Sequence, residues 1–242
     1  MAYASVIPYG EQNTANERSK LRDLIEICIP YGLILLVIWT PRPWQRYLWW
    51  VAAASVVLVT YSSFDGWKAM GLRMGNFWRS AWIVGLASLL AGAAVFVAAR
   101  LHTLHLPRGP LAFVATYCAY AVWSGVQQLL LQGVFLQRLL RLIPNSIHAA
   151  FAASLLFATA HLPSVILTPM TLIWGFVACL VFLRYRNLYS LALAHAILGI
   201  AVAVTIPGPV DHNMRVGLGY VRYQQHRHTS SPYPLAHPLP KP

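Results

Sequence analysis

Residues 188–206 read LYSLALAHAILGIAVAVTI, a run of 19 residues without a single Asp, Glu, Lys or Arg. Crossing the hydrocarbon core of a bilayer takes about 20 mostly apolar residues in a helix. A helix is required because each unpaired backbone N–H or C=O group costs several kcal/mol in lipid. The length and composition of this run therefore predict a membrane-spanning helix.

Six further apolar runs precede it, at residues 24–40, 47–61, 81–99, 111–136, 147–161 and 165–183. Turn-forming sequences rich in Pro, Gly, Asn and Arg separate several of them. The runs at 47–61 and 147–161 are short, so a tilted or half-spanning helix is the alternative there. We expect an all-α polytopic membrane bundle of about seven, or eight, transmembrane helices.

The composition excludes a water-soluble fold of this size. Of the 242 residues, 58% are hydrophobic and 10% are charged, whereas soluble domains carry roughly 25% charged residues. The net charge of +12 comes from 18 Lys and Arg residues, most of which lie between the apolar runs or in the termini. This placement indicates that the basic residues set the membrane topology and contact anionic lipid head groups. Nucleic-acid binding is disfavoured, because no basic stripe is interleaved with base-stacking aromatic residues.

The basic residues also indicate an orientation. Those at 18–22, 68–79, 138–141 and 184–186 would share one side of the membrane, and the opposite connections carry Arg42, Arg46, Arg100 and Arg108. This distribution favours a cytoplasmic N-terminus. We expect a multi-pass protein of the cell membrane, the inner membrane of a bacterium. The basic C-terminal segment would then face outward, although basic segments usually lie on the cytoplasmic side. Because residues 1–20 are polar, we expect the first apolar run, and not a cleavable signal peptide, to direct insertion.

We divide the chain into three parts. Residues 1–20 form a polar N-terminal tail, residues 21–206 the transmembrane domain, and residues 207–242 a C-terminal tail rich in Pro, His and Arg. Proline disfavours both helix and central strand, so the C-terminal tail is expected to be extended or polyproline-like. Its histidines are more typical of a solvated tail than of a metal site, and we expect no metal and no cofactor.

The three cysteines, Cys28, Cys118 and Cys179, all fall inside apolar runs. Their separation lacks the spacing of a metal site. Buried thiols that pack as small apolar groups are therefore favoured over a disulfide or a ligand set.

Polar side chains at bilayer depth are costly, so each one needs a reason. The fourth run holds the densest group, Ser124, Gln127, Gln128 and Gln132. Ser124, Gln128 and Gln132 are spaced by four and share one helical face. Together with His161, which ends the fifth run, and His195 in the seventh, the glutamines are expected to converge in one pocket. The alternative is a set of interhelical hydrogen bonds of roughly 1 kcal/mol each.

The order and spacing of these residues resemble those of the CPBP family, the CAAX-processing and bacteriocin-processing intramembrane proteases also called Abi proteins. That family shows Glu-Glu-xxx-Arg, Phe-xxx-His and His-xxx-Asn on successive membrane helices. Here the corresponding segments are QQLLLQ at 127–132, FATAH at 157–161 and HAILG at 195–199. The resemblance extends over about residues 71–206 and implies the fold of an intramembrane endopeptidase.

The resemblance also implies roles for single residues. In that family the glutamates activate a water for peptide hydrolysis, and the histidines and asparagine hold the water and the developing oxyanion. The assignment by position is Gln127 and Gln128 for the glutamates, Gln132 for the arginine, His161 and His195 for the histidines, and Gly199 for the asparagine. Four of these six polar positions differ from the family's pattern.

The departures argue against proteolysis, because a general base must accept a proton near neutral pH and a neutral amide cannot. Between Asp65 and Asp211 the chain contains no Asp or Glu. Glu26 is expected to pair with Arg22, one turn earlier. Gln132 stands where the family has arginine. This change agrees with the loss of the glutamates, since without them a guanidinium would be an unpaired buried charge. We expect a pseudoprotease that serves as a binding, assembly or structural subunit of a membrane complex.

The main alternative is an active intramembrane CAAX-type endopeptidase in which His161 or His195 acts as the base, since imidazole titrates near neutral pH. Ser124 as a nucleophile is a weaker variant, because such a serine more often packs against a helix. A small-solute carrier is a third option, although the chain shows no inverted repeat and no paired Gly/Pro breaks. The expected partners are membrane lipids, a membrane protein or complex, and a prenylated or transmembrane peptide, but no nucleic acid.

Overall fold

The seven apolar runs all fold as helices. The computed structural model describes residues 9–64, 66–107 and 109–229, and every regular element in these ranges is helical. In chain order the elements are α1 (Tyr9–Trp39), α2 (Trp44–Ser62), α3 (Phe77–Ser80), α4 (Trp82–Arg100), α5 (Pro110–Gln128), η1 (Leu129–Leu136), α6 (Gln137–Leu142), α7 (Ser146–Thr159), α8 (Leu167–Tyr185), α9 (Leu188–Thr205), α10 (Gly208–Asp211), η2 (His212–Met214) and α11 (Gly217–Thr229). Of these, η1 is a π-helix and η2 a 3-10 helix. The all-α prediction is confirmed for the described residues.

Three of the described helices, α4, α8 and α9, are long and apolar enough to cross a membrane. Helix α7 is apolar but has only 14 residues, which is short for the hydrocarbon thickness. The structure therefore supports three spans and does not establish the predicted number of about seven.

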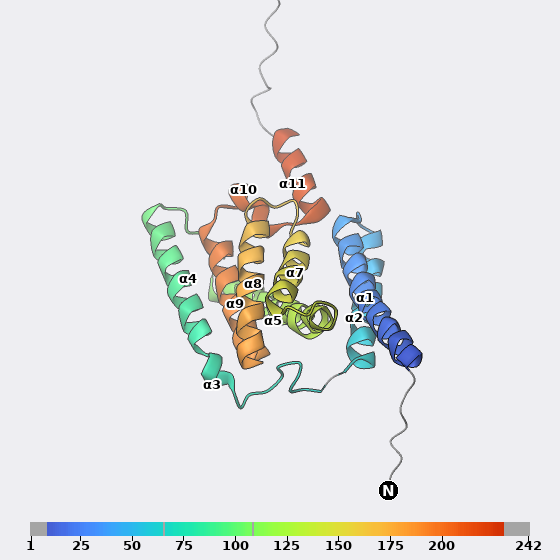
Figure 1. Cartoon of the computed structure of the whole chain (residues 1–242). Coiled ribbons are helices and arrows are strands. Elements are labelled where there is room, and N and C mark those ends of the chain that lie inside the picture. Colours follow the sequence, from blue (N-terminus) through green and yellow to red (C-terminus); the bar gives the residue numbers. More distant parts are fainter. Residues whose placement is uncertain (1–8, 65, 108, 230–242) are drawn as a thin grey trace, which may run out of the picture.

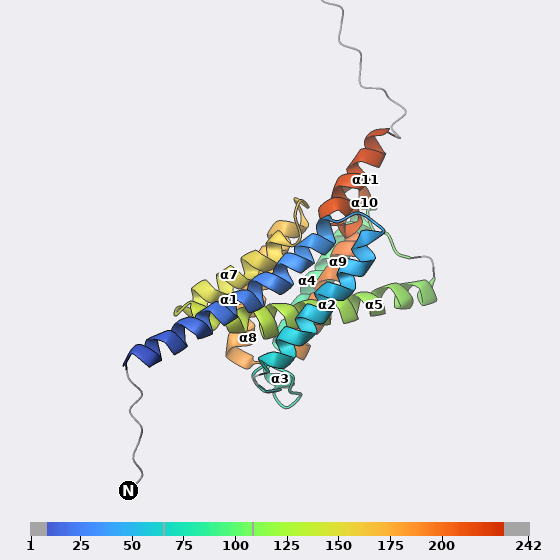
Figure 2. The same cartoon turned by 90° about the vertical axis from the view of Figure 1, so that its right-hand side faces the viewer.

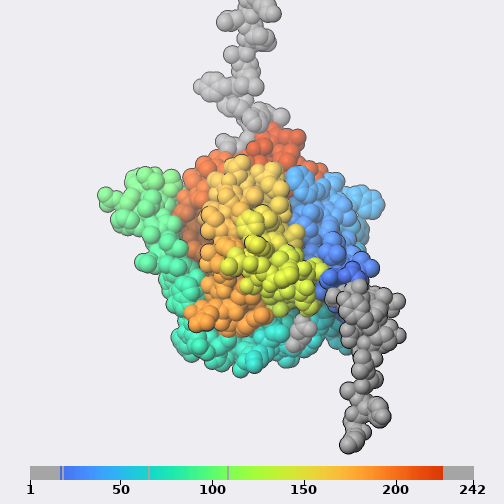
Figure 3. Space-filling model, in the orientation of Figure 1, coloured from blue at the N-terminus to red at the C-terminus, as the bar shows by residue number. Residues whose placement is uncertain are grey.

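The helices pack in neighbouring pairs, and α9 lies between α4 and α8 in the view of Figure 1. Both α4 and α5 pack on α9, α7 packs on α8, and α1 pairs with α2 (Figure 1). Helix α5 runs across the others instead of alongside them (Figure 2). On the face seen in Figure 3, α7 and α8 form the surface beside α1, and the segment after α2 closes the lower end. Because η1 continues α5, this arrangement brings η1 into the interior, where residues 131–136 are all buried.

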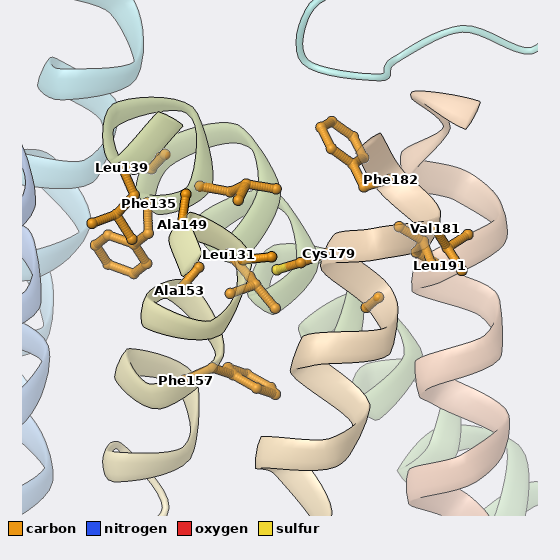
Figure 4. Close-up of a cluster of buried hydrophobic side chains, with 14 of the residues drawn as sticks. Leu131, Phe135, Leu139, Ala149, Ala153, Phe157, Cys179, Val181, Phe182 and Leu191 are labelled. Atoms are coloured by element: carbon orange, nitrogen blue, oxygen red, sulfur yellow. The ribbon is translucent and has the colours of Figure 1, made fainter. Parts of the chain in front are cut away.

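The apolar core lies where η1, α7, α8 and α9 meet. Leu131, Ala153, Cys179 and Leu191 are almost fully buried there. Figure 4 shows Leu131 and Cys179 close together between η1 and α8, and Phe157 between α7 and α8. Small residues along α7 let its backbone approach η1 and α8 closely, which is how membrane helices gain packing energy without a hydrophobic driving force.

The cysteines follow the sequence expectation only in part. All three thiols are free, but Cys28 and Cys118 are exposed and Cys179 alone is buried. The prediction that all three are buried was therefore wrong. A membrane helix is apolar around its whole circumference, so an apolar run does not tell which side faces the core.

A buried ion network fixes α1 to α6. Glu26 accepts hydrogen bonds from Arg22 Nε at 2.7 Å and from Arg138 Nε at 3.1 Å. Asp23 pairs with Arg141 at 2.6 Å. The predicted pair of Arg22 and Glu26 is confirmed. Arg138, which the sequence placed in a basic connection at the membrane surface, is instead 1% exposed.

The π-helix η1 begins directly after Gln128. Such segments are rare and occur frequently at functional sites. Near its end, Arg138 Nη1 donates to the carbonyl oxygens of Gly133 at 2.9 Å and Val134 at 3.3 Å. The guanidinium therefore supports the backbone of the element that carries Gln132.

The terminal segments are more helical than expected. Helix α1 begins at Tyr9, inside the predicted N-terminal tail. The expectation of an extended C-terminal tail was wrong for residues 217–229, which form α11; residues 230–242 lie outside the described residues. Residues 210–229 contain no proline, so nothing blocks a helix there. Gly217 N donates to Leu162 O at 2.7 Å, and the buried Tyr220 lies against His212 with ring centroids 4.0 Å apart.

Candidate functional site

A large, mostly apolar cavity lies between α4, α5, α8 and α9, with α1 and the end of α7 completing its wall. Its volume is about 1640 Å³, which exceeds the roughly 300–1,000 Å³ of ordinary small-molecule pockets. Gln127, His161 and His195 line it, together with Phe157. Three of the five predicted site residues therefore share one cavity.

The other two glutamines lie behind this wall and form a chain of side-chain hydrogen bonds with His195. Gln132 Nε2 donates to Gln128 Oε1 at 3.4 Å, and Gln128 Nε2 donates to His195 Nδ1 at 3.1 Å. Both glutamines are fully buried. Because Nδ1 accepts in this arrangement, the neutral imidazole carries its proton on Nε2. Gln132 Oε1 is buried without a hydrogen-bond partner among the described residues.

His161 has the opposite hydrogen-bond pattern. Its Nδ1 donates to the Phe157 carbonyl oxygen at 2.7 Å, which leaves Nε2 as an acceptor in the neutral ring. The Phe157 ring contacts both imidazoles edge to face, with centroids 4.9 Å from His161 and 5.8 Å from His195. The centroid of the Trp174 indole lies 5.9 Å from that of the His195 ring. The two imidazoles are thus held in fixed positions around Phe157.

Local sequence explains how His195 is positioned. Arg186 adopts a left-handed conformation, with φ of 49°, and ends α8. Asn187 then caps α9, because its side chain accepts a hydrogen bond from Ser190 N at 3.0 Å. Asn187 Nδ2 donates to Arg73 O at 2.7 Å, so the segment before α3 holds the start of α9. His195 lies two helical turns further along α9.

The structure separates the roles of the polar residues on α5. Ser124 Oγ donates to the Tyr120 carbonyl oxygen at 3.0 Å, and its side chain is fully buried. A serine bonded to the backbone one turn earlier is a packing residue. Gln127 is half-buried and faces the cavity, whereas Gln128 on the adjacent position faces the interior. The predicted shared face of Ser124, Gln128 and Gln132 is buried along its whole length.

Tyr120 explains the glycine at position 199. A Cβ atom added to Gly199 would lie 1.8 Å from Tyr120 Oη and 2.5 Å from its Cζ. The phenol therefore occupies the space that an asparagine side chain at 199 would need. Sequence reasoning missed Tyr120, because only the packing of α5 on α9 brings the two positions together.

The sequence also missed a carboxylate on the cavity wall. Asp211 lines the cavity, together with His105 and Asn213. It was placed in the C-terminal tail because Pro207 and Pro209 precede it. Glu17, Asp23 and Glu26 of α1 lie elsewhere and are engaged in ion pairs with arginine or lysine.

The geometry agrees with a family-level comparison. Residues 110–201 match the family described as type II CAAX prenyl endopeptidase Rce1-like. This segment runs from the start of α5 into α9 and contains all the predicted site residues and Gly199. No curated protein and no solved structure matches the chain. The resemblance seen in the motifs is confirmed over this segment: the chain is a helical membrane protein similar to CAAX-type endopeptidases.

Proposed function

We propose that this chain is a pseudoprotease that binds a membrane-embedded ligand in the cavity and serves as a binding, assembly or structural subunit of a membrane complex. The observation that carries the proposal is the hydrogen-bonded chain of Gln132, Gln128 and His195. Neutral amides stand where the related endopeptidases have water-activating carboxylates, and an amide cannot serve as a general base.

The burial of this chain supports the same conclusion. Gln128 and Gln132 are fully enclosed, so neither can reach a substrate in the cavity without a rearrangement. Hydrogen bonds between side chains on different helices of a membrane protein stabilise one arrangement of those helices. The cavity itself remains large and apolar, which favours a lipid-like or peptide ligand.

A second function rests on one specific observation. His161 lines the cavity and has an Nε2 atom that can accept a proton. An endopeptidase that uses this imidazole as its base is therefore the alternative. It would lack carboxylate support and depend on amide donors such as Gln127 for the oxyanion.

Cleavage assays on the purified full-length protein distinguish the two functions. The substrates are a quenched fluorogenic prenylated peptide and the same peptide without its prenyl group. The variants are His161→Ala and His195→Ala, with His148→Ala as the matched control, because His148 is exposed on α7 outside the cavity. We expect no cleavage by any of these proteins. We also expect binding of the prenylated peptide, measured as thermal stabilisation.

A fourth variant, Gln127→Glu combined with Gln128→Glu, tests whether lost carboxylates account for the inactivity. Cleavage by the unmodified protein that both cavity variants abolish and His148→Ala preserves would establish the endopeptidase instead.

Purification in mild detergent, followed by mass spectrometry, tests the second half of the proposal, the role as a subunit of a membrane complex. A subunit should carry stoichiometric membrane-protein partners, and a protein that purifies alone contradicts that role.

A further inference from the structure

The charge of the cavity wall is opposite to that of the chain. The protein has a net charge of +12, yet among the described residues that line the cavity there is no Lys and no Arg, and Asp211 is the one acidic side chain. The remaining titratable side chains on the wall include three histidines, His105, His161 and His195. With neutral histidines, the ionised form of Asp211 gives the wall one negative charge, which disfavours an anionic head group and favours a cationic one.

Asp211 is enclosed without a cation. It is 2% exposed, and no salt bridge joins it to a described residue. The other acidic side chains that the structure describes, Glu17, Asp23 and Glu26, all have one. A buried carboxylate without a partner charge costs several kcal/mol. Burial accordingly raises the pKa of Asp211. His105 of the α4–α5 connection lies near enough to oppose this shift, but it forms no ion pair with the carboxylate.

The local backbone role of Asp211 does not account for its charge. Its Oδ1 accepts a hydrogen bond from Asn213 N at 2.9 Å, which starts η2, and the backbone N–H groups of Met214 and of Asp211 itself also favour the carboxylate. An asparagine side chain makes the same bond without a charge, and is equally suited to this position. These backbone groups are neutral, so the charge of the carboxylate has no opposite charge paired with it among the described residues.

We propose that the cavity binds an amphiphile whose apolar chain lies between α4, α5, α8 and α9 and whose ammonium head group pairs with Asp211. This inference rests on the proposed ligand-binding function and names the class of ligand. The wall along the chain path is aliphatic and aromatic, with Leu86, Leu90, Val97, Trp123, Trp174 and Val202 among its members. An ammonium group next to a buried carboxylate forms a charge-assisted hydrogen bond, which is stronger than the neutral bond to an alcohol.

The test uses two probes of equal chain length, a bromine-bearing alkylamine and the corresponding bromine-bearing alkanol. The full-length protein is placed in lipid nanodiscs, and bromine quenching of Trp174 is obtained as the difference between the unmodified protein and Trp174→Phe. We expect the amine to bind more tightly than the alkanol. Asp211→Asn should weaken amine binding about tenfold, because a charged contact becomes a neutral one, and leave alkanol binding unchanged.

The outcomes separate this inference from the proposed function. If both probes quench Trp174 with equal affinity, and Asp211→Asn changes neither, the ammonium site is wrong while ligand binding stands. If neither probe quenches Trp174, the cavity does not bind amphiphiles and both proposals fail. An alkyl carboxylate of the same length gives a test that needs no Asp211 variant. It must bind more weakly than the alkanol, and tighter binding overturns the inference.

Discussion

Replacing Arg138 with methionine should weaken the attachment of α1 to the rest of the bundle. Arg138 Nε binds Glu26 on α1, and its Nη2 donates to Val59 O on α2 at 3.2 Å. Its Nη1 binds the carbonyl oxygens at the end of η1. Arg138→Met fills a similar volume and removes all these donors. The variant therefore tests whether the buried charge holds three elements together.

The expected cost follows from burial. Removing one partner of a buried ion pair destabilises a protein by about 3–5 kcal/mol, because the other charge stays behind uncompensated. Glu26 would keep its hydrogen bonds from Arg22 and Ser63. We therefore expect the lower limit, about 3 kcal/mol, which is roughly a hundredfold shift in the folding equilibrium.

Arg22→Met is the matched control, because it removes the second arginine from the same carboxylate. The Arg22 side chain is 57% exposed, whereas that of Arg138 is 2% exposed. Solvent screening limits exposed pairs to about 0–1 kcal/mol. The assay is unfolding by sodium dodecyl sulfate in mixed micelles, followed by circular dichroism.

Equal losses of stability in Arg138→Met and Arg22→Met would refute this reasoning, since burial would then make no difference. A third variant, Arg138→Lys, separates charge from geometry. Lysine keeps the charge but cannot reach both Glu26 and the η1 carbonyl oxygens, so we expect it to recover only part of the loss.

The remaining predictions concern two glycines and the cavity carboxylate. Gly199→Ala should destabilise the protein by about 1–3 kcal/mol, because the new methyl group overlaps Tyr120; Tyr120→Ala should relieve this conflict in the double variant. Gly71→Ala should cost a similar amount, about 1–3 kcal/mol, since Gly71 has φ of +73° and its Cβ would lie 2.6 Å from Phe182. Both are measured in the same unfolding assay. For Asp211, burial holds the folded-state pKa above its ordinary value. The protonated carboxyl group therefore contributes to the free energy of unfolding. This contribution is complete below the unfolded pKa of about 3.9 and is lost as the pH rises through the folded pKa. Relative to Asp211→Asn, the unmodified protein should lose stability as the pH is raised above about 4.

Each of these has a clear contrary result. Gly85 on α4 has no atom within 4 Å of an added Cβ, so Gly85→Ala should be neutral or stabilising by up to about 1 kcal/mol. A loss at Gly199 no larger than that at Gly85 would show that Tyr120 moves aside freely. An unchanged stability difference between the unmodified protein and Asp211→Asn across the pH range would show that Asp211 does not titrate in a buried setting.

Elements that depend on local physics could be predicted from the sequence. Backbone groups in lipid must be satisfied within the segment, so an uncharged run such as 188–206 is helical wherever it is placed in the bundle. The pair of Arg22 and Glu26 is spaced by four and meets on one helix. The fully buried face of Ser124, Gln128 and Gln132 follows from the same periodicity. The order of the polar segments indicated the endopeptidase relationship, because those segments are short and continuous.

The tertiary structure decided the features that depend on which helices meet. The hydrogen bond between Gln128 and His195 joins positions 67 residues apart, and the contact of Tyr120 with Gly199 depends on how α5 crosses α9. The burial of Arg138 required a carboxylate from α1. The prolines of the C-terminal segment predicted a tail that includes Asp211, whereas in the structure Asp211 lines the cavity. In each case the decisive contact joins residues that are distant in the chain. Local composition and periodicity carry no information about such contacts.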